Sequence, residues 1–197
     1  MAINLTKGQR IDIGLKRLGV GLGWDPNASG SQDDFDLDAS AFLLAQNGQV
    51  PTEEFFVFYG SQSRNSENQP MSPDGSVFSS GDDRTGGNSD GDDETLFVDL
   101  TRLDPRIEQI VFTVTIHDAD LRKQNFGQVK NSFIRIYNQE NQEEILKYEL
   151  EEDFSIETAI EFGRLYKRNG AWRFEAIGNG VAGGLAVFVK KYAAAFS

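Results

Sequence analysis

The alternation of side chains over residues 110–116 restricts the fold of this chain more than any other feature of its sequence. Even positions there carry Ile, Phe or Val, and odd positions carry Val or Thr. A period of two predicts a β-strand with one face in a core. Shorter segments of the same kind occur at residues 55–59, 96–100 and 133–137, and a weaker one at 147–150.

Turn signals separate these segments. Asn169-Gly170 lies between residues 162–166 and 172–176, an arrangement that predicts a β-hairpin with a type I′ turn. Asn47-Gly48 and Asp74-Gly75 predict two further turns.

The size and composition of the chain agree with one β domain. Its 197 residues include 15 Phe, which is enough apolar surface for one well-buried core. Helical periodicity is scarce, and its best candidate is residues 185–195. Many short strands separated by turns predict a sandwich or a barrel.

Several classes of protein are disfavoured by composition. The chain has no Cys, which excludes disulfides, thiol catalysis and thiolate metal sites, and its single His117 argues against a zinc site. Residues 1–7 lack the charged start and apolar run of a signal peptide, and the longest nearly apolar stretch, 183–189, is too short to span a bilayer. We therefore expect a cytoplasmic protein without direct membrane insertion.

The negative charge of the chain is concentrated in two places. Residues 33–38 carry −4 and residues 81–94 carry −5 of the net −12, which leaves −3 for the other 177 residues. Two dense clusters in a nearly neutral chain indicate a site more than a generally acidic surface. The sequence offers no Lys/Arg patch that could neutralise phosphates, so nucleic acid is not an expected partner.

Clustered carboxylates of this kind suit calcium, a hard cation that takes six to eight oxygen ligands. In a strand, Asp36 and Asp38 would point to the same face while Leu37 enters the core. The second cluster is rich in Gly, which lets backbone carbonyls turn inward. Asn88, Asp90 and Asp92 match the first half of an EF-hand loop, but the required Gly and the following helix are missing.

Two other features of the sequence are expected to have structural roles. Residues 178–183 fit the dinucleotide pattern G-x-G-x-x-G, but only 14 residues follow, too few for a βαβ unit, so we expect a tight turn. His117 follows a predicted strand and is expected to be an ordinary hydrogen-bonding residue, although the neighbouring Asp118 or Asp120 could extend a metal site.

Taken with their order, several motifs resemble the tellurium-resistance TerD family of bacterial stress proteins. The matching segments are 20–25 (VGLGWD), 36–44 (DLDASAFLL), 74–77 (DGSV), 81–86 (GDDRTG), 91–94 (GDDE), 124–129 (QNFGQV) and 163–166 (GRLY). The resemblance implies an all-β fold, a β-sandwich of two mainly antiparallel sheets with a few short helices, in a single domain over residues 1–197. It also implies two bound calcium ions and a role in tellurite resistance and related stress responses.

The resemblance also assigns candidate metal ligands, which are the residues on the acidic motifs of the family. They are Asp25, Asp36, Asp38, Asp82, Asp83, Asp92, Asp93 and Glu94, with Asn88 and Asp90 as a second tier. Two positions depart from the family pattern: Asp83 stands where Asn is usual, and Arg164 where Glu is common.

We therefore expect a calcium-binding, non-catalytic stress protein whose metal-ordered acidic loops form a docking surface. Because the chain has no thiol to reduce or capture tellurite, any resistance would act through partners. The resemblance suggests other tellurite-resistance proteins, some of them membrane-associated. Two alternatives stay open: a carboxylate-based hydrolase, and a module that binds a nucleotide or a sugar in a pocket independent of metal.

Overall fold

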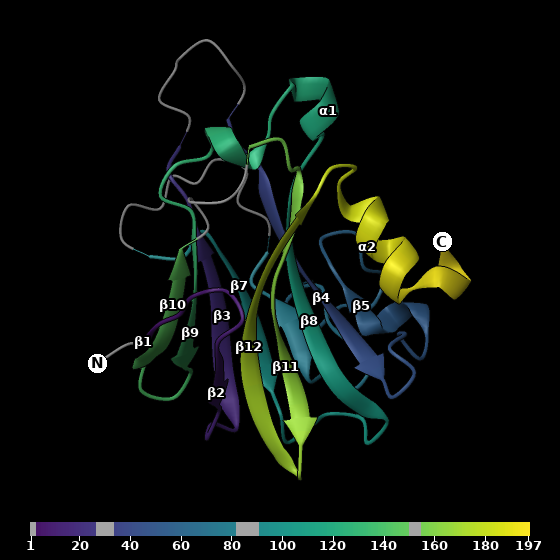
Figure 1. Ribbon diagram of the computed structural model, residues 1–197. Helices are drawn as coiled ribbons and strands as arrows, with labels where there is room; N and C mark the ends of the chain where they lie inside the picture. Colours follow the sequence, from purple (N-terminus) through teal and green to yellow (C-terminus); the bar gives the residue numbers. More distant parts are fainter. Residues whose placement is uncertain (1–2, 27–33, 82–90, 150–154) are drawn as a thin grey trace.

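The computed structural model describes residues 3–26, 34–81, 91–149 and 155–197, and the following account concerns these residues. They form two six-stranded sheets packed face to face, with short helices at one end and along one side (Figure 1). All strand pairs are antiparallel except β1 with β10. The all-β class and the sandwich of mainly antiparallel sheets are thus confirmed.

Sheet A is formed by strands from both halves of the chain, and Glu94 of the second acidic cluster begins one of them. Its order is β1 (Ile3–Asn4), β10 (Glu144–Glu149), β9 (Phe133–Asn138), β3 (Arg17–Gly23), β7 (Glu94–Asp99) and β6 (Val77–Ser79). The central strand β3 lies between β9 and β7, with Leu22 opposite Ile134 on one side and Glu94 on the other.

Sheet B is built around the strand that the alternation predicts. Its order is β2 (Arg10–Asp12), β12 (Ala171–Val181), β11 (Ala159–Arg168), β8 (Ile107–Ile116), β4 (Leu37–Ala45) and β5 (Phe56–Val57). The β11–β12 hairpin turns at Asn169 and Gly170, whose φ angles of 53° and 78° are those of the predicted type I′ turn.

Helices are short and peripheral. They are η1 (Glu53–Phe55), α1 (Ala119–Arg122), η2 (Phe126–Gln128), α2 (Leu185–Tyr192) and η3 (Ala194–Phe196). Helix α2 covers the outer face of sheet B, where the ring of Tyr192 lies 5.3 Å from that of Phe42 on β4. Because of this cover, both faces of β8 are buried, including the face that carries Thr113.

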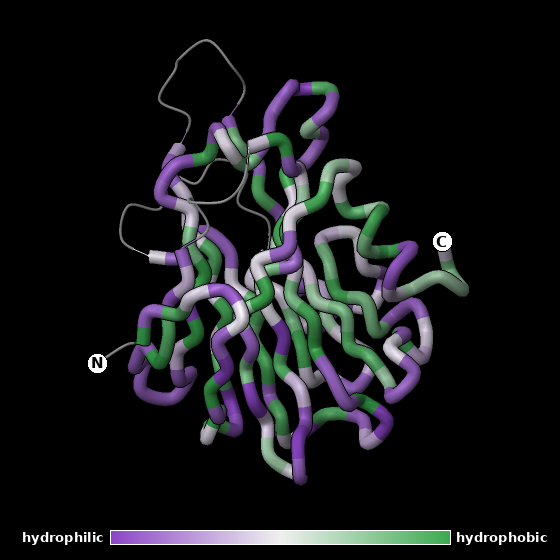
Figure 2. Tube along the Cα trace, in the orientation of Figure 1, coloured by the Kyte–Doolittle hydropathy of each residue, from purple (hydrophilic) through white to green (hydrophobic). Residues whose placement is uncertain are grey.

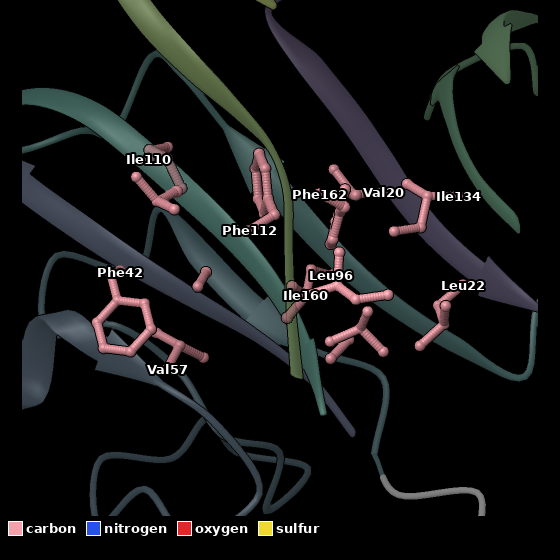
Figure 3. Close-up of a cluster of buried hydrophobic side chains, with 14 of the residues drawn as sticks. Val20, Leu22, Phe42, Val57, Leu96, Ile110, Phe112, Ile134, Ile160 and Phe162 are labelled. Atoms are coloured by element: carbon pink, nitrogen blue, oxygen red, sulfur yellow. The ribbon is translucent and has the colours of Figure 1, made fainter. Parts of the chain in front are cut away.

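The core lies between the sheets. Figure 3 shows Val20 and Leu96 of sheet A near Ile160 and Phe162 of sheet B, and hydrophobic residues recur along the strands between more polar ones (Figure 2). The even positions of residues 110–116 enter this core, as their alternation predicts. Among the described residues, no helix has the length and apolar character needed to cross a membrane.

Two local expectations are wrong. Of residues 55–59, only Phe56 and Val57 form a strand, because Phe55 ends a 3-10 turn and the chain turns again after Val57, where the carbonyl of Phe58 accepts a hydrogen bond from the N–H of Ser61. The glycine-rich segment that begins at Gly178 continues β12 to Val181, although Gly178 has a positive φ of 60°. The strand ends at Val181, and Gly183 and Gly184 follow it with positive φ.

Candidate functional site

The predicted ligands that the structure describes lie at one end of the sandwich. Strand β3 ends there at Gly23, β7 begins at Glu94 and β4 begins at Leu37. Strands β3 and β7 are antiparallel neighbours, and β7 approaches β4 across the gap between the sheets. The fold therefore brings the two acidic segments, far apart in sequence, to the same end.

Glu94 joins the two acidic segments directly. Glu94 lies on the same face of β7 as the core residues Leu96 and Val98, and it is only 3% exposed. One carboxylate oxygen accepts a hydrogen bond of 2.7 Å from the backbone N–H of Ala39, the residue after Asp38. A carboxylate of sheet A thus satisfies an amide at the start of β4 in sheet B.

Asp93 fixes the neighbouring turn. Its carboxylate accepts a hydrogen bond of 3.0 Å from the backbone N–H of Trp24, and its own N–H donates to the carbonyl of Leu22. The indole N–H of Trp24 donates to the carbonyl of Phe35, just before Asp36. The buried Trp24 therefore links the ends of β3 and β7 to the chain that enters β4.

Asp92 lies on the outer face of sheet A. It receives two hydrogen bonds from the guanidinium of Arg135, of 2.7 and 3.1 Å, which raise the pKa of Arg135. The carboxylate occupies the space above Gly21, where an added Cβ would lie 2.1 Å from the carboxyl carbon. Arg135 also lies over the ring of Tyr137 and 3.5 Å from a carboxylate oxygen of Glu144.

Asp36 and Asp38 are both buried, with 5% and 6% of their surface exposed, and Leu37 between them enters the core as predicted. Asp36 lies 3.6 Å from the guanidinium of Arg122 on α1, and its carbonyl accepts a hydrogen bond from the N–H of His117. Asp38 lies 3.4 Å from Nδ1 of His117. Both acids therefore have a basic side chain beside them.

Asp38 and Glu94 face opposite sides of β4. Asp38 opens into a groove of about 380 Å³ on the outer face of sheet B, shared with Tyr59, His117 and the start of α2. Glu94 lies on the side that faces sheet A, with Leu96. The two clusters thus meet at the backbone of β4, and their carboxylates lie on different faces of that strand.

Asp25 lies two residues after the end of β3 at Gly23. Its carboxylate accepts a hydrogen bond from the side-chain amide of Asn131, and its N–H donates to the carbonyl of Lys130. The remaining candidates, Asp82, Asp83, Asn88 and Asp90, lie outside the described residues.

The donor atoms here suit a hard cation, because they are carboxylate oxygens held in a largely buried setting. Their arrangement in the described ranges does not by itself form a metal site: no three or more acids or histidines there are grouped to hold an ion. Sequence reasoning missed the basic neighbours Arg122 and Arg135. Arg135 occupies an outward position in the alternation of residues 133–137, and that position is the one available signal of its role.

The sequence and the fold were both compared with those of known proteins. The TerD domain model matches residues 1–192. The chain is 48% identical to tellurium resistance protein TerD of Serratia marcescens and 48% identical to general stress protein 16U of Bacillus subtilis (strain 168), in each case over 98% of this chain and 97% of the relative. The crystal structure of a homologue of telluride resistance protein (TerD) from Streptomyces coelicolor A3(2) superposes with a TM-score of 0.70. It is 26% identical, and the match covers 89% of this chain and 95% of that one.

Proposed function

This chain belongs to the TerD domain family, a family of tellurium-resistance and stress-response proteins, and we propose that it is a non-catalytic stress protein that binds calcium at its acidic end. The relatives are named for resistance and stress and not for a reaction. Calcium would be held by carboxylates of both acidic segments, including those predicted at Asp82 and Asp83.

The observation that carries the proposal is the bond between Glu94 and Ala39, which ties the two acidic segments together at a buried position. Asp93 and Glu94 accept hydrogen bonds from neutral backbone amides, which stabilise a carboxylate without neutralising its charge. The described residues 34–38 and 91–94 carry −3 each and lie at the same end of the sandwich, so folding gathers like charge there. A divalent cation at this end would lower the repulsion among these carboxylates.

The consequence for partners follows from the same electrostatics. A bound cation would remove the repulsion between the two acidic segments and order the chain around them. The ordered surface would then dock other proteins of the resistance system. Hydrogen exchange measured with and without calcium should show increased protection at residues 34–38 and 91–94, and unchanged exchange there would contradict this part of the proposal.

Thermal melting after chelator treatment tests calcium binding. Calcium at about a hundred times its dissociation constant should stabilise the protein by roughly 2.7 kcal/mol. For a chain of this length that raises the melting temperature by roughly 5–11 °C. Magnesium should raise it less, because it keeps its water ligands.

The variant Glu94→Gln isolates the charge of one proposed ligand. Its side-chain carbonyl can still accept the hydrogen bond from Ala39, so the metal-free variant should melt close to the wild type. Its calcium affinity should fall by about tenfold or more. Glu108→Gln, on β8 at the far end of the sandwich, is the matched control and should respond to calcium like the wild type. A wild type that shows no calcium-dependent shift overturns the proposal, and an equal response in Glu94→Gln removes Glu94 from the ligand set.

A further inference from the structure

A second groove, of about 460 Å³, lies on the outer face of sheet A at the end opposite to the acidic segments. Strand β7 begins at Glu94 in the acidic end and reaches this groove at residues 97–99. The volume falls within the range of small-molecule sites, about 300–1,000 Å³. It is separate from the proposed calcium site and does not depend on it.

Aromatic rings form the floor of the groove. Phe78 of β6 and Phe97 of β7 are directly paired across the strands, and their partly exposed rings are stacked with centroids 4.8 Å apart. The next residue in the same row, Gly19 of β3, has no side chain, and the ring of Tyr137 lies across it. Aromatic side chains therefore run along one row of the sheet.

One wall of the groove carries an ion pair between Arg17 and Asp99. Arg17 donates a hydrogen bond of 3.0 Å to Asp99, which also accepts from the backbone and hydroxyl of Thr101. Burial raises the pKa of Asp99, but the hydrogen bonds from Thr101 and Arg17 outweigh it and hold the pKa below its usual range. This pair offers little attraction to a ligand, because its charges are already matched.

Arg102, unlike Arg17, offers a positive charge that a ligand could pair with. Its guanidinium is exposed and lies against the turn at Gly75, where an added Cβ would be 2.6 Å from Nη2. Among the residues that the structure describes, no carboxylate forms an ion pair with it. Gly75 therefore leaves the space that holds this cation at the rim, while Gln139 and the exposed Glu140 line the rim as well.

We propose that this groove binds a small planar aromatic carboxylate of single negative charge. The ring would pack against the exposed parts of the stacked Phe78 and Phe97 rings, and the carboxylate would pair with Arg102 in a charge-assisted hydrogen bond. Glu140 on the rim opposes a second negative charge, which disfavours phosphate dianions. Because Glu140 and the Arg17–Asp99 pair leave the rim with little net charge, an anion without a ring is held weakly.

Titration of the intact, ¹⁵N-labelled protein with indole-3-acetate, in chelator, tests the proposal. Saturable shifts are expected at Phe78, Phe97 and Arg102 in the millimolar range or below. The neutral indole-3-acetamide should bind at least about fivefold more weakly, and acetate should not saturate. Adenosine monophosphate distinguishes a nucleotide site: if it binds more tightly than indole-3-acetate, the carboxylate assignment is wrong.

Variants at two neighbouring arginines separate the site from general charge. Arg102→Gln should weaken indole-3-acetate by about tenfold and make it equal to the amide. Arg106→Gln removes one guanidinium that is already paired with Asp104 outside the groove, and should leave binding unchanged. Both positions are exposed, so folding should be retained, and melting curves verify it. Absence of saturable binding by the wild type, or equal loss in both variants, overturns the proposal.

Discussion

Substitution of Gly21 by Ala should release Asp92 from Arg135. The new Cβ would lie 2.1 Å from the carboxyl carbon of Asp92, so the short carboxylate side chain must leave its place and its two hydrogen bonds break. The Asp92 side chain is 6% exposed and that of Arg135 25% exposed, so the pair is largely but not fully buried. Loss of a fully buried pair costs about 3–5 kcal/mol, and the access of water to Arg135 reduces this to about 2–3 kcal/mol.

Urea denaturation in chelator measures this cost, and a second background tests its origin. In Asp92→Ala the space above Gly21 is empty, so adding Gly21→Ala should change the unfolding free energy by less than about 0.5 kcal/mol. If Gly21→Ala costs the same in both backgrounds, the contact with Asp92 is not the reason for the glycine. Repeating the Asp92→Ala measurement with calcium also shows whether Asp92 is a metal ligand, because a ligand's loss would reduce the stabilisation by calcium.

Two further predictions concern the core and its cover. Phe112→Ala, at the centre of the core, should lower the unfolding free energy by about 3–5 kcal/mol in urea denaturation, and a loss below about 1 kcal/mol would contradict the packing described. Burial, then the hydrogen bond with Glu161, raises the pKa of Tyr192, so the folded state holds this proton when the unfolded chain has released it. Stability should therefore be retained up to about pH 10 and fall as pH rises above it. Absorbance titration should show one tyrosine that ionises only on unfolding, and its loss in Tyr192→Phe identifies it.

Much of the fold follows from local patterns in the sequence. The alternation of residues 110–116 and 133–137 predicts β8 and β9, and Asn169-Gly170 predicts the hairpin turn, because strand period and turn chemistry are local properties. The order of strands within the sheets is set by contacts far apart in sequence. Residues 55–59 mislead because aromatic side chains favour strands, whereas here they stack beside Phe42 on the outer face of sheet B.

The candidate site is predicted less completely. Dense carboxylates mark the acidic end from sequence alone, and burial of Leu37 between two acids follows from strand period. The bidentate contact of Arg135 with Asp92 depends on strand register across β3 and β9, and on the missing side chain of Gly21. The position of Asp38 and Glu94 on opposite sides of β4 requires the packing of two sheets, which residue spacing does not specify.

Trp24 gives the acidic end a natural optical reporter. The chain has two tryptophans, and Trp172 lies at the far hairpin beside Lys167. Replacing Trp172 by Phe would leave the emission of Trp24, whose buried indole donates to the carbonyl of Phe35 between β3 and β4. Events at the carboxylates could then be followed in real time by fluorescence, without a dye or a label.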